Sequence, residues 1–328
     1  MPQPPPTDAA QVVLRSPDEL RRWSERCRAA GLVVGLVPTM GALHDGHRSL
    51  VRRARAECDR VVVSIFVNPT QFAPGEDLGR YPRPLERDLA MLAAERADAA
   101  FVPPVEAMYP EGTLTTVRLT GPLVDSLEGA ARPGHLDGVA TVVTKLLVAT
   151  RPDRAYFGEK DAQQLAVVRR IAADLDTGVR IVACPLVRDA DGLALSSRNA
   201  YLTPDERAQA LAIPSGLAAA ARAWAVGERD AGRLAARVRE RLERSPGLVP
   251  DYVAVVDADT FHEVADAARG CRIVVAGRMP SVRLIDTICL GVDAVPAVPG
   301  DSEAPNEAAE RSNQAPGAAE WSRPCSVS

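Results

Sequence analysis

Lysine is almost missing from this chain. Of its 39 basic residues, only Lys145 and Lys160 are lysines, and all the others are arginines. The ammonium group is a compact charge that reaches places where a planar guanidinium does not fit. A lysine in this sequence is therefore a stronger sign of a specific role than a lysine usually is.

Other absences exclude whole classes of protein. The 328 residues contain no apolar run of about 18 or more residues, which a transmembrane helix needs. The first ten residues, MPQPPPTDAA, lack the basic and apolar regions of a signal peptide. A net charge of −4 argues against extended nucleic-acid binding, which requires a basic stripe. We therefore expect a cytoplasmic protein that binds neither membranes nor nucleic acid.

The cysteines and histidines show no pattern of a metal site. No HExxH helix is present, and a zinc site built on His44 and His47 would lack further ligands. The cysteines are scattered without C-x-x-C spacing, which predicts small core residues rather than disulfides or metal ligands. They are Cys27, Cys58, Cys184, Cys271, Cys289 and Cys325.

The segment from Val37 to His47, VPTMGALHDGH, carries the clearest functional pattern. It follows the apolar run GLVVGLV, which predicts a buried strand, and precedes HRSLVRRARAEC, which has helical periodicity. His47 therefore falls at or near a helix N-terminus, where unpaired N–H groups favour an anion. Gly41 and Gly46 allow the backbone to approach a ligand closely. Because His44 and His47 are two of only four histidines, we interpret this as a phosphate-handling turn rather than as a polar surface turn.

This turn is not a P-loop, although the spacing Gly41-x4-Gly46 imitates one. The lysine and hydroxyl residue that should follow the second glycine are replaced by His47 and Arg48. The ammonium that grips phosphate in a P-loop is therefore missing from the turn.

Apolar, β-rich runs alternate with helical patterns through the first half of the chain. Strands are predicted over 32–37, 61–67, 99–102, 154–157 and 179–183, and helices from the turn to about 59 and over 85–95, 139–149 and 162–174. Such alternation is typical of βαβ units and a parallel sheet. Ligands bind past the carboxyl ends of such strands, where His44, Asn68 and Gly158 fall.

The character of the chain changes after Pro185. A long helical region is predicted to begin with Thr203 as its N-cap and Pro204 at its first position, and strands are predicted over 252–256, 272–276 and 282–290. We therefore predict one domain over 11–185 and a smaller α+β domain over 186–296. The composition of 297–328, like that of 1–10, predicts disorder.

Further segments place polar groups near predicted strand ends. NPTQF supplies Asn68 and Gln71, and FGEKDAQQL supplies Lys160 and Asp161 at a strand-to-helix junction, with Gln164 one turn later. RPGHLDGVATVVTKLL places a histidine before an apolar helix, and LALSSRN offers two hydroxyls, a guanidinium and a carboxamide in succession. Taken singly, most of these would be ordinary caps and turns.

Taken together, VPTMGALHDGH, NPTQF, GEKDAQQL and LSSRN resemble, in this order and spacing, pantothenate synthetase, the pantoate–β-alanine ligase family of the HxGH nucleotidylyltransferase superfamily. The resemblance runs from about Val12 to Leu290. It implies a homodimer with a Rossmann-like, doubly wound parallel sheet that binds ATP and pantoate, and with a smaller C-terminal lid domain. It also implies that ATP, (R)-pantoate and β-alanine give AMP, pyrophosphate and pantothenate through a pantoyl adenylate, with Mg²⁺ as cofactor.

The resemblance implies residue roles as well. His44 and His47 would donate hydrogen bonds to the triphosphate, with His47 as the candidate proton donor, and Lys160 would neutralise phosphate charge. Gln71 and Gln164 would bind pantoate, Gln71 would also bind β-alanine, and Asn68 would support that pocket. Neutral amides suit pantoate, because a cation on its carboxylate would stabilise the nucleophile in the ground state. The implied ATP-binding residues are Met40, Gly41, Ala42, Leu43, His44, Asp45, Gly46, His47, Gly158, Glu159, Lys160, Asp161, Val187, Leu195, Ser196, Ser197 and Arg198.

Some positions and two alternative functions remain open in the sequence. Asp88 is a candidate Mg²⁺ ligand, against the alternative of an acid on a solvated helix face. Leu136 and Thr287 stand where the family usually has an aromatic residue and an asparagine. The same turn would also serve an adenylyl- or cytidylyltransferase with a different acceptor, or a non-catalytic nucleotide-binding protein.

Overall fold

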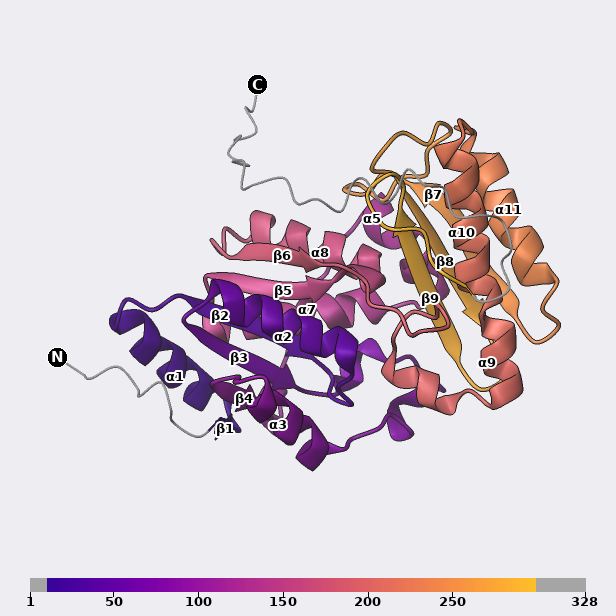
Figure 1. Cartoon of the computed structure of the whole chain (residues 1–328). Coiled ribbons are helices and arrows are strands. Elements are labelled where there is room, and N and C mark those ends of the chain that lie inside the picture. Colours follow the sequence, from indigo (N-terminus) through magenta and orange to yellow (C-terminus); the bar gives the residue numbers. More distant parts are fainter. Residues whose placement is uncertain (1–10, 299–328) are drawn as a thin grey trace, which may run out of the picture. The chain divides into compact units, whose positions relative to one another are not determined.

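Six parallel strands form the sheet on which the candidate site is built, in a computed structural model that describes residues 11–298 (Figure 1). Their order across the sheet is β1-β4-β3-β2-β5-β6. From β2 the chain continues to β3 on one side, whereas β5 leads to β6 on the other, so the sheet is doubly wound as predicted. The strands are β1 Val12–Leu14, β2 Val34–Thr39, β3 Arg60–Ile65, β4 Ala99–Phe101, β5 Arg154–Gly158 and β6 Arg180–Cys184.

Helices cover both faces of this sheet. On one face, α1 (Pro17–Ala29), α7 (His135–Thr150) and α8 (Ala162–Asp174) bury apolar side chains in a common core with the strands. On the other face, α2 (Asp45–Glu57) and α3 (Leu85–Ala94) do the same. In α2 the buried residues are Leu50, Val51 and Ala54. They lie on one face of the helix, which explains how this arginine-rich segment packs against the sheet. Because the helices cover the faces of the sheet, the carboxyl ends of the strands remain the place where a ligand can bind.

A second sheet is antiparallel and consists of β7 (Val249–Val256), β8 (Arg272–Arg278) and β9 (Arg283–Cys289). One face packs against α10 (Ala212–Ala225) and α11 (Ala231–Glu243) in a core of its own. The other face contributes Ala254, Val256 and Val274 to a cluster with Ala162 and Ala166 of α8. The smaller α+β part expected from the sequence is therefore present, and it packs on the helix that follows β5.

The remaining elements are short. They are α4 Val105–Met108, α5 Pro122–Asp125, α6 Glu128–Ala131, α9 Pro204–Ala210, η1 Pro69–Gln71, η2 Asp77–Gly79, η3 Glu159–Asp161 and η4 Ser197–Tyr201. Thr203 caps α9 by accepting from the Glu206 N–H at 3.2 Å, with Pro204 at the first position, as predicted. The long helical region predicted to begin there consists of three helices, α9, α10 and α11.

The structure differs from the prediction in two further places. The prediction omits β1 and α1, although Ser16 and Pro17 give α1 an ordinary start: the Ser16 hydroxyl accepts from the Glu19 N–H at 3.2 Å. The helix predicted from Val139 begins four residues earlier, because α7 starts directly after Gly134. The disorder predicted for 1–10 and 297–328 falls outside the described residues, except at positions 297 and 298.

The described cysteines are buried free thiols, in agreement with the prediction of small core residues: Cys27, Cys58, Cys184, Cys271 and Cys289. Cys325 lies outside the described part of the chain. Within residues 11–298, no helix combines the length and the hydropathy that crossing a bilayer demands.

Candidate active site

A cavity of about 210 Å³ lies where the loops after β2, β3 and β5 meet the segment that follows β6. This is the switch point of the sheet, between β2 and β5, where doubly wound folds bind ligands. Most of the predicted site residues line it: Met40, His44, Gly46, His47, Asn68, Gln71, Gly158, Lys160, Asp161, Gln164, Val187, Leu195, Ser196, Ser197 and Arg198. Five predicted ATP-binding residues lie outside the lining, namely Gly41, Ala42, Leu43, Asp45 and Glu159.

Asp88 holds the turn after β2 in place. Its two carboxylate oxygens accept hydrogen bonds from the backbone N–H groups of Ala42 and Leu43, each at 2.8 Å. Burial raises the pKa of Asp88, and these two donors oppose that rise. Asp88 is only 1% exposed, so the alternative of a solvated helix face is wrong. The magnesium role is not favoured either, because both oxygens already bind backbone donors and do not line the cavity.

The two histidines of the turn cap α2, and backbone donors fix their tautomers. His44 Nδ1 accepts from the Gly46 N–H at 3.2 Å, and His47 Nδ1 accepts from the His44 N–H at 3.3 Å. In the neutral state each ring therefore carries its proton on Nε2. The ring centroids lie 4.1 Å apart. A Cβ at position 46 would lie 2.9 Å from the His44 ring, so the close approach requires Gly46.

Both imidazoles are neutral at physiological pH. Burial lowers the pKa of His44 to about 4, and the Lys160 ammonium adds to this effect. Burial, followed by His44 and Lys160, lowers the pKa of His47 well below its ordinary value of 6.5. The pair consequently offers two Nε2–H donors to an anion without bringing positive charge of its own.

Lys160 supplies the positive charge of the cavity wall next to the histidines. It lies in η3, directly after β5, with its Nζ 3.8 Å from Asp161 Oδ1 and one fifth of its side chain exposed. Its neighbour Glu159 points elsewhere and pairs with Arg272 of β8 at 3.3 Å, which explains its absence from the lining. Of two successive residues in η3, Glu159 therefore contacts the second sheet and Lys160 lines the cavity.

The predicted amides Gln71 and Gln164 both line the cavity. Asn68 Nδ2 donates to Gln71 Oε1 at 3.1 Å, which leaves Gln71 Nε2 as the donor side, 3.2 Å from Met40 Sδ. Gln164 lines the cavity from the first turn of α8. The adjacent Gln163 is buried and donates to the backbone oxygens of Leu123 and Ser126, so only one residue of the pair serves the cavity.

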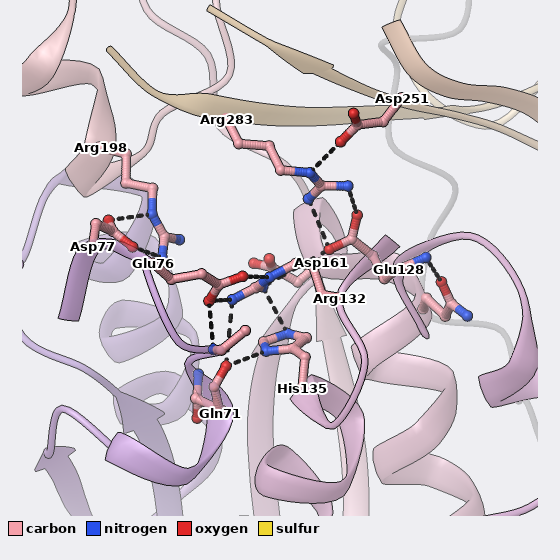
Figure 2. A network of polar contacts seen from close by, with 12 residues as sticks. Gln71, Glu76, Asp77, Glu128, Arg132, His135, Asp161, Arg198, Asp251 and Arg283 are labelled. Atoms are coloured by element: carbon pink, nitrogen blue, oxygen red, sulfur yellow. Dashed lines mark hydrogen bonds and ion pairs between the residues drawn. The ribbon is translucent and has the colours of Figure 1, made fainter. Parts of the chain in front are cut away.

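The segment after β6 closes the cavity from the side of the second sheet. The Leu195 N–H donates to the Val187 oxygen at 3.0 Å, which pairs two of the predicted ATP-binding residues. Ser197 Oγ donates to the Ala42 oxygen at 3.0 Å. Arg198 forms a two-pronged ion pair with Asp77, at 2.8 and 2.9 Å (Figure 2). The SSRN motif therefore reaches both the histidine turn and η2.

Sequence reasoning missed part of the wall. Apolar side chains of Phe66, Val139, Val142, Val143, Leu146 and Phe157 line the cavity, and so do Tyr81 and Arg132. The apolar periodicity of α7 predicted a buried face but not what that face meets. Leu136 and Thr287, the two departures from the family pattern, are buried outside this cavity.

Comparison with known proteins decides the family. The family model described as pantoate-beta-alanine ligase matches residues 12–289. The chain belongs to the pantoate–β-alanine ligase family. Its sequence is 54% identical to the pantothenate synthetase of Roseiflexus castenholzii over 257 residues, which cover 78% of this chain and 92% of that protein. It is 50% identical to the pantothenate synthetase of Thermotoga neapolitana over 279 residues, which cover 85% and 99%.

Solved ligases of this family share the fold. The crystal structure of pantothenate synthetase from Thermus thermophilus superposes with a TM-score of 0.80 at 47% identity and covers 85% of this chain and 99% of that one. Pantoate-beta-alanine ligase from Francisella tularensis, solved with β-γ ATP and β-alanine, gives a TM-score of 0.70 at 32% identity, over 87% and 99%. This chain is accordingly an enzyme, a pantoate–β-alanine ligase.

Proposed function

We propose that the cavity joins (R)-pantoate to β-alanine at the expense of ATP, through a pantoyl adenylate. The observation that carries the proposal is the convergence, in one cavity, of two neutral imidazole donors, one ammonium group and two carboxamides. The first three suit a triphosphate, and the last two suit a hydroxy acid whose carboxylate must stay nucleophilic.

In the first step, a pantoate carboxylate oxygen attacks the α-phosphorus of ATP, and the bond to the β-phosphate oxygen breaks to release pyrophosphate. His44 and His47 donate from Nε2 to phosphate oxygens, and Lys160 balances the charge that develops there. No protein nucleophile is needed. Because the pKa of His47 is far below 7, we propose that it acts as a hydrogen-bond donor and not as an imidazolium acid.

In the second step, the amine of β-alanine attacks the carbonyl of the adenylate, and AMP leaves with the oxygen that pantoate contributed. Gln71 and Gln164 hold the pantoyl group, Gln71 contacts β-alanine, and Asn68 orients Gln71. The apolar surface of α7 would bury the two methyl groups of pantoate.

The remaining predicted residues would either contact the nucleotide or support the residues that do. Gly158, Asp161, Val187 and Leu195 would contact the adenosine, and Met40, Gly46, Ser196, Ser197 and Arg198 the rest of the nucleotide. Gly41, Ala42, Leu43, Asp45 and Glu159 would act through the backbone and the scaffold. Residues 186–296 would form the lid domain, with the core cluster between Leu193 and Leu290 as its own core, over a first domain of 11–185.

Magnesium would be held mainly by ATP. Among the described residues, no three His, Cys, Asp or Glu side chains come together as a metal site. Asp161 lines the cavity and pairs with Lys160 only at 3.8 Å, so one carboxylate is at hand. A single carboxylate fits Mg²⁺, which keeps phosphate oxygens and water as its other ligands and screens their charge.

We also propose that the enzyme is a cytoplasmic homodimer. Five buried, unpaired thiols suit a reducing compartment. Residues 111–120 are almost entirely exposed, with Leu114 at 95%, and a second copy of the chain would cover such a segment.

The test follows a labelled oxygen. Pantoate carrying ¹⁸O in its carboxylate should yield AMP with one ¹⁸O, together with pyrophosphate, and AMP should not form without pantoate. ADP as product, AMP formation that ignores pantoate, or AMP without the label would each refute the proposal.

A further inference from the structure

A chain of three polar residues, Glu76, Arg132 and His135, leads to Gln71 and has no role in the reaction scheme above (Figure 2). Arg132 donates from Nε and Nη2 to the two carboxylate oxygens of Glu76, at 2.8 and 2.7 Å. From Nη1 it donates to His135 Nε2 at 3.0 Å. His135 in turn donates from Nδ1 to the backbone oxygen of Gln71 at 2.8 Å. Arg132, His135 and Gln71 all line the cavity, whereas Glu76 does not.

The partners of His135 determine its tautomer. A backbone oxygen only accepts and a guanidinium only donates, so the ring must carry its proton on Nδ1 and a lone pair on Nε2. This is the opposite tautomer to that of His44 and His47. Burial, with the neighbouring Arg132, keeps His135 neutral by lowering its pKa to about 4. Every contact of the chain therefore joins a donor to an acceptor, and the Gln71 oxygen also accepts from Arg132 Nη2 at 3.4 Å.

Gln71 needs such support, because it ends a helical turn of only three residues, η1. The first turn of α7 presses on η1 at two positions that lie on one side of the helix, His135 and Gly138. A Cβ at Gly138 would lie 2.4 Å from the Thr70 oxygen and 2.6 Å from the Gln71 nitrogen, so the two backbones are in direct contact. Asn68 Nδ2 donates to the Gly138 oxygen at 3.1 Å and completes the contact.

We propose that His135 is a positioning residue for pantoate. It fixes the backbone of Gln71, while Asn68 fixes the Gln71 side chain, so that the amide N–H groups meet the acid at the right place. Arg132 and Glu76 hold the imidazole in the tautomer that this contact requires. The inference rests on the proposed function, since it assumes that Gln71 binds pantoate.

Two substitutions separate the two contacts of the ring. In His135→Asn the side-chain amide stands close to the place of Nδ1, so it can still donate to the Gln71 oxygen but no longer reaches Arg132. In His135→Gln the amide extends to the place of Nε2, so it can meet Arg132 but loses the Gln71 oxygen. The exposed His262 provides a control, His262→Asn.

The measured quantities are KM for pantoate and KM for ATP, with thermal unfolding as a check on folding. His135→Gln should raise KM for pantoate about tenfold, which corresponds to one orienting hydrogen bond, while KM for ATP stays unchanged. His135→Asn and His262→Asn should stay close to wild type in both. Glu76→Gln, at a half-buried side chain, should raise KM for pantoate in the same direction by a smaller factor and serves if His135→Gln does not fold.

Equal effects of Asn and Gln at position 135, or equal shifts in both KM values, would mean that the ring only fills space, and would overturn the inference. For Glu76→Gln, an unchanged KM for pantoate or an equal rise in KM for ATP would do the same. Failure of the wild-type enzyme to form AMP from pantoate and ATP would instead refute the proposed function, so the two failures are distinguishable.

Discussion

At the scale of single residues, the two lysines differ in what surrounds them. Lys160 lines the cavity beside His44 and His47, next to the exposed carboxylate of Asp161. Lys145 lies in α7 with its ammonium 5.7 Å from the centre of the Tyr109 ring. A guanidinium satisfies a cation–π contact as well as an ammonium does, whereas it is too wide for a confined phosphate contact.

Lys160→Arg should therefore slow pyrophosphate release by about tenfold or more, although it conserves charge, because a displaced cation no longer matches the phosphate oxygens. Lys145→Arg is the matched control and should be near wild type. The measurement is the rate of pyrophosphate release at saturating ATP and pantoate. Equal, near-normal rates for the two variants would mean that Lys160 is merely a solvated partner of Asp161.

Asp88→Asn tests whether this carboxylate holds the turn or holds magnesium. An asparagine has one acceptor oxygen, so its NH2 group would face one of the two N–H donors of the turn. We expect a loss of about 1–2 kcal/mol in the free energy of unfolding and a higher KM for ATP, with an unchanged dependence on Mg²⁺ concentration. If the variant instead needed much more Mg²⁺ at normal stability, Asp88 would be a metal ligand.

Residues that directly follow a predicted strand could be placed from the sequence. His44, Asn68 and Lys160 lie between the end of a strand and the next helix, and parallel strands bring their carboxyl ends to one edge. Asp88 and Arg132 could not be placed this way, because their partners lie far away in the sequence: Ala42 is 46 positions from Asp88, and Glu76 is 56 positions from Arg132. Periodicity shows that a helix has a buried face but not which loop that face meets.

At the scale of elements, one buried ion cluster joins α6 to the second sheet. Arg283 of β9 donates to both oxygens of Glu128, at 2.6 and 3.0 Å, and to Asp251 of β7 at 2.6 Å (Figure 2). Tyr252 donates to Glu128 at 2.6 Å. Burial alone would raise the pKa of Glu128, but the Arg283 guanidinium lowers it, so the carboxylate is ionised.

Glu128→Gln should cost about 3 kcal/mol in the free energy of unfolding, because it leaves Arg283 buried with a single counterion, Asp251. Urea unfolding measures the loss. Arg21→Ala, which removes an exposed pair within α1, is the control and should leave stability nearly unchanged. A Glu128 variant as stable as this control would show that the cluster does not hold the two parts together.

Elements with long periodic patterns were predictable, and short ones were not. Helices α2, α3 and α8 lie close to their predicted ranges, because their apolar faces repeat over several turns. Strand β1 has three residues, of which Val12 and Val13 are exposed at the sheet edge, so no alternation marks it. The short helices between α3 and α7 depend on contacts with distant segments, which the local sequence does not contain.

At the scale of the whole molecule, the histidines make stability depend on pH. The folded chain protonates His44 and His135 only at about pH 4, and His47 also far below 6.5, whereas the unfolded chain protonates them near 6.5. The unfolded state therefore binds more protons as pH falls, and stability should decline from about pH 6.5 to pH 4. Asp88 and Asp286 have the opposite effect on stability. Burial raises their pKa values above the ordinary 3.8, so on these two groups the folded state binds protons more readily than the unfolded state.

Denaturant unfolding at pH 7.0, 6.0 and 5.0 should show this decline. His135→Asn should reduce the slope, since it removes one of the three groups. A free energy of unfolding that stays constant over this range in the wild-type protein would contradict the assignment of three neutral histidines.

The scarcity of lysine also makes this molecule unusual toward amine chemistry. Reagents that acylate amines leave guanidinium groups untouched, so among its side chains they can attack only Lys160 and Lys145. One of these lines the cavity and the other is stacked over Tyr109. A dye coupled to Lys160 would report on occupancy of the cavity, and a support coupled to Lys160 would immobilise the enzyme through its own site.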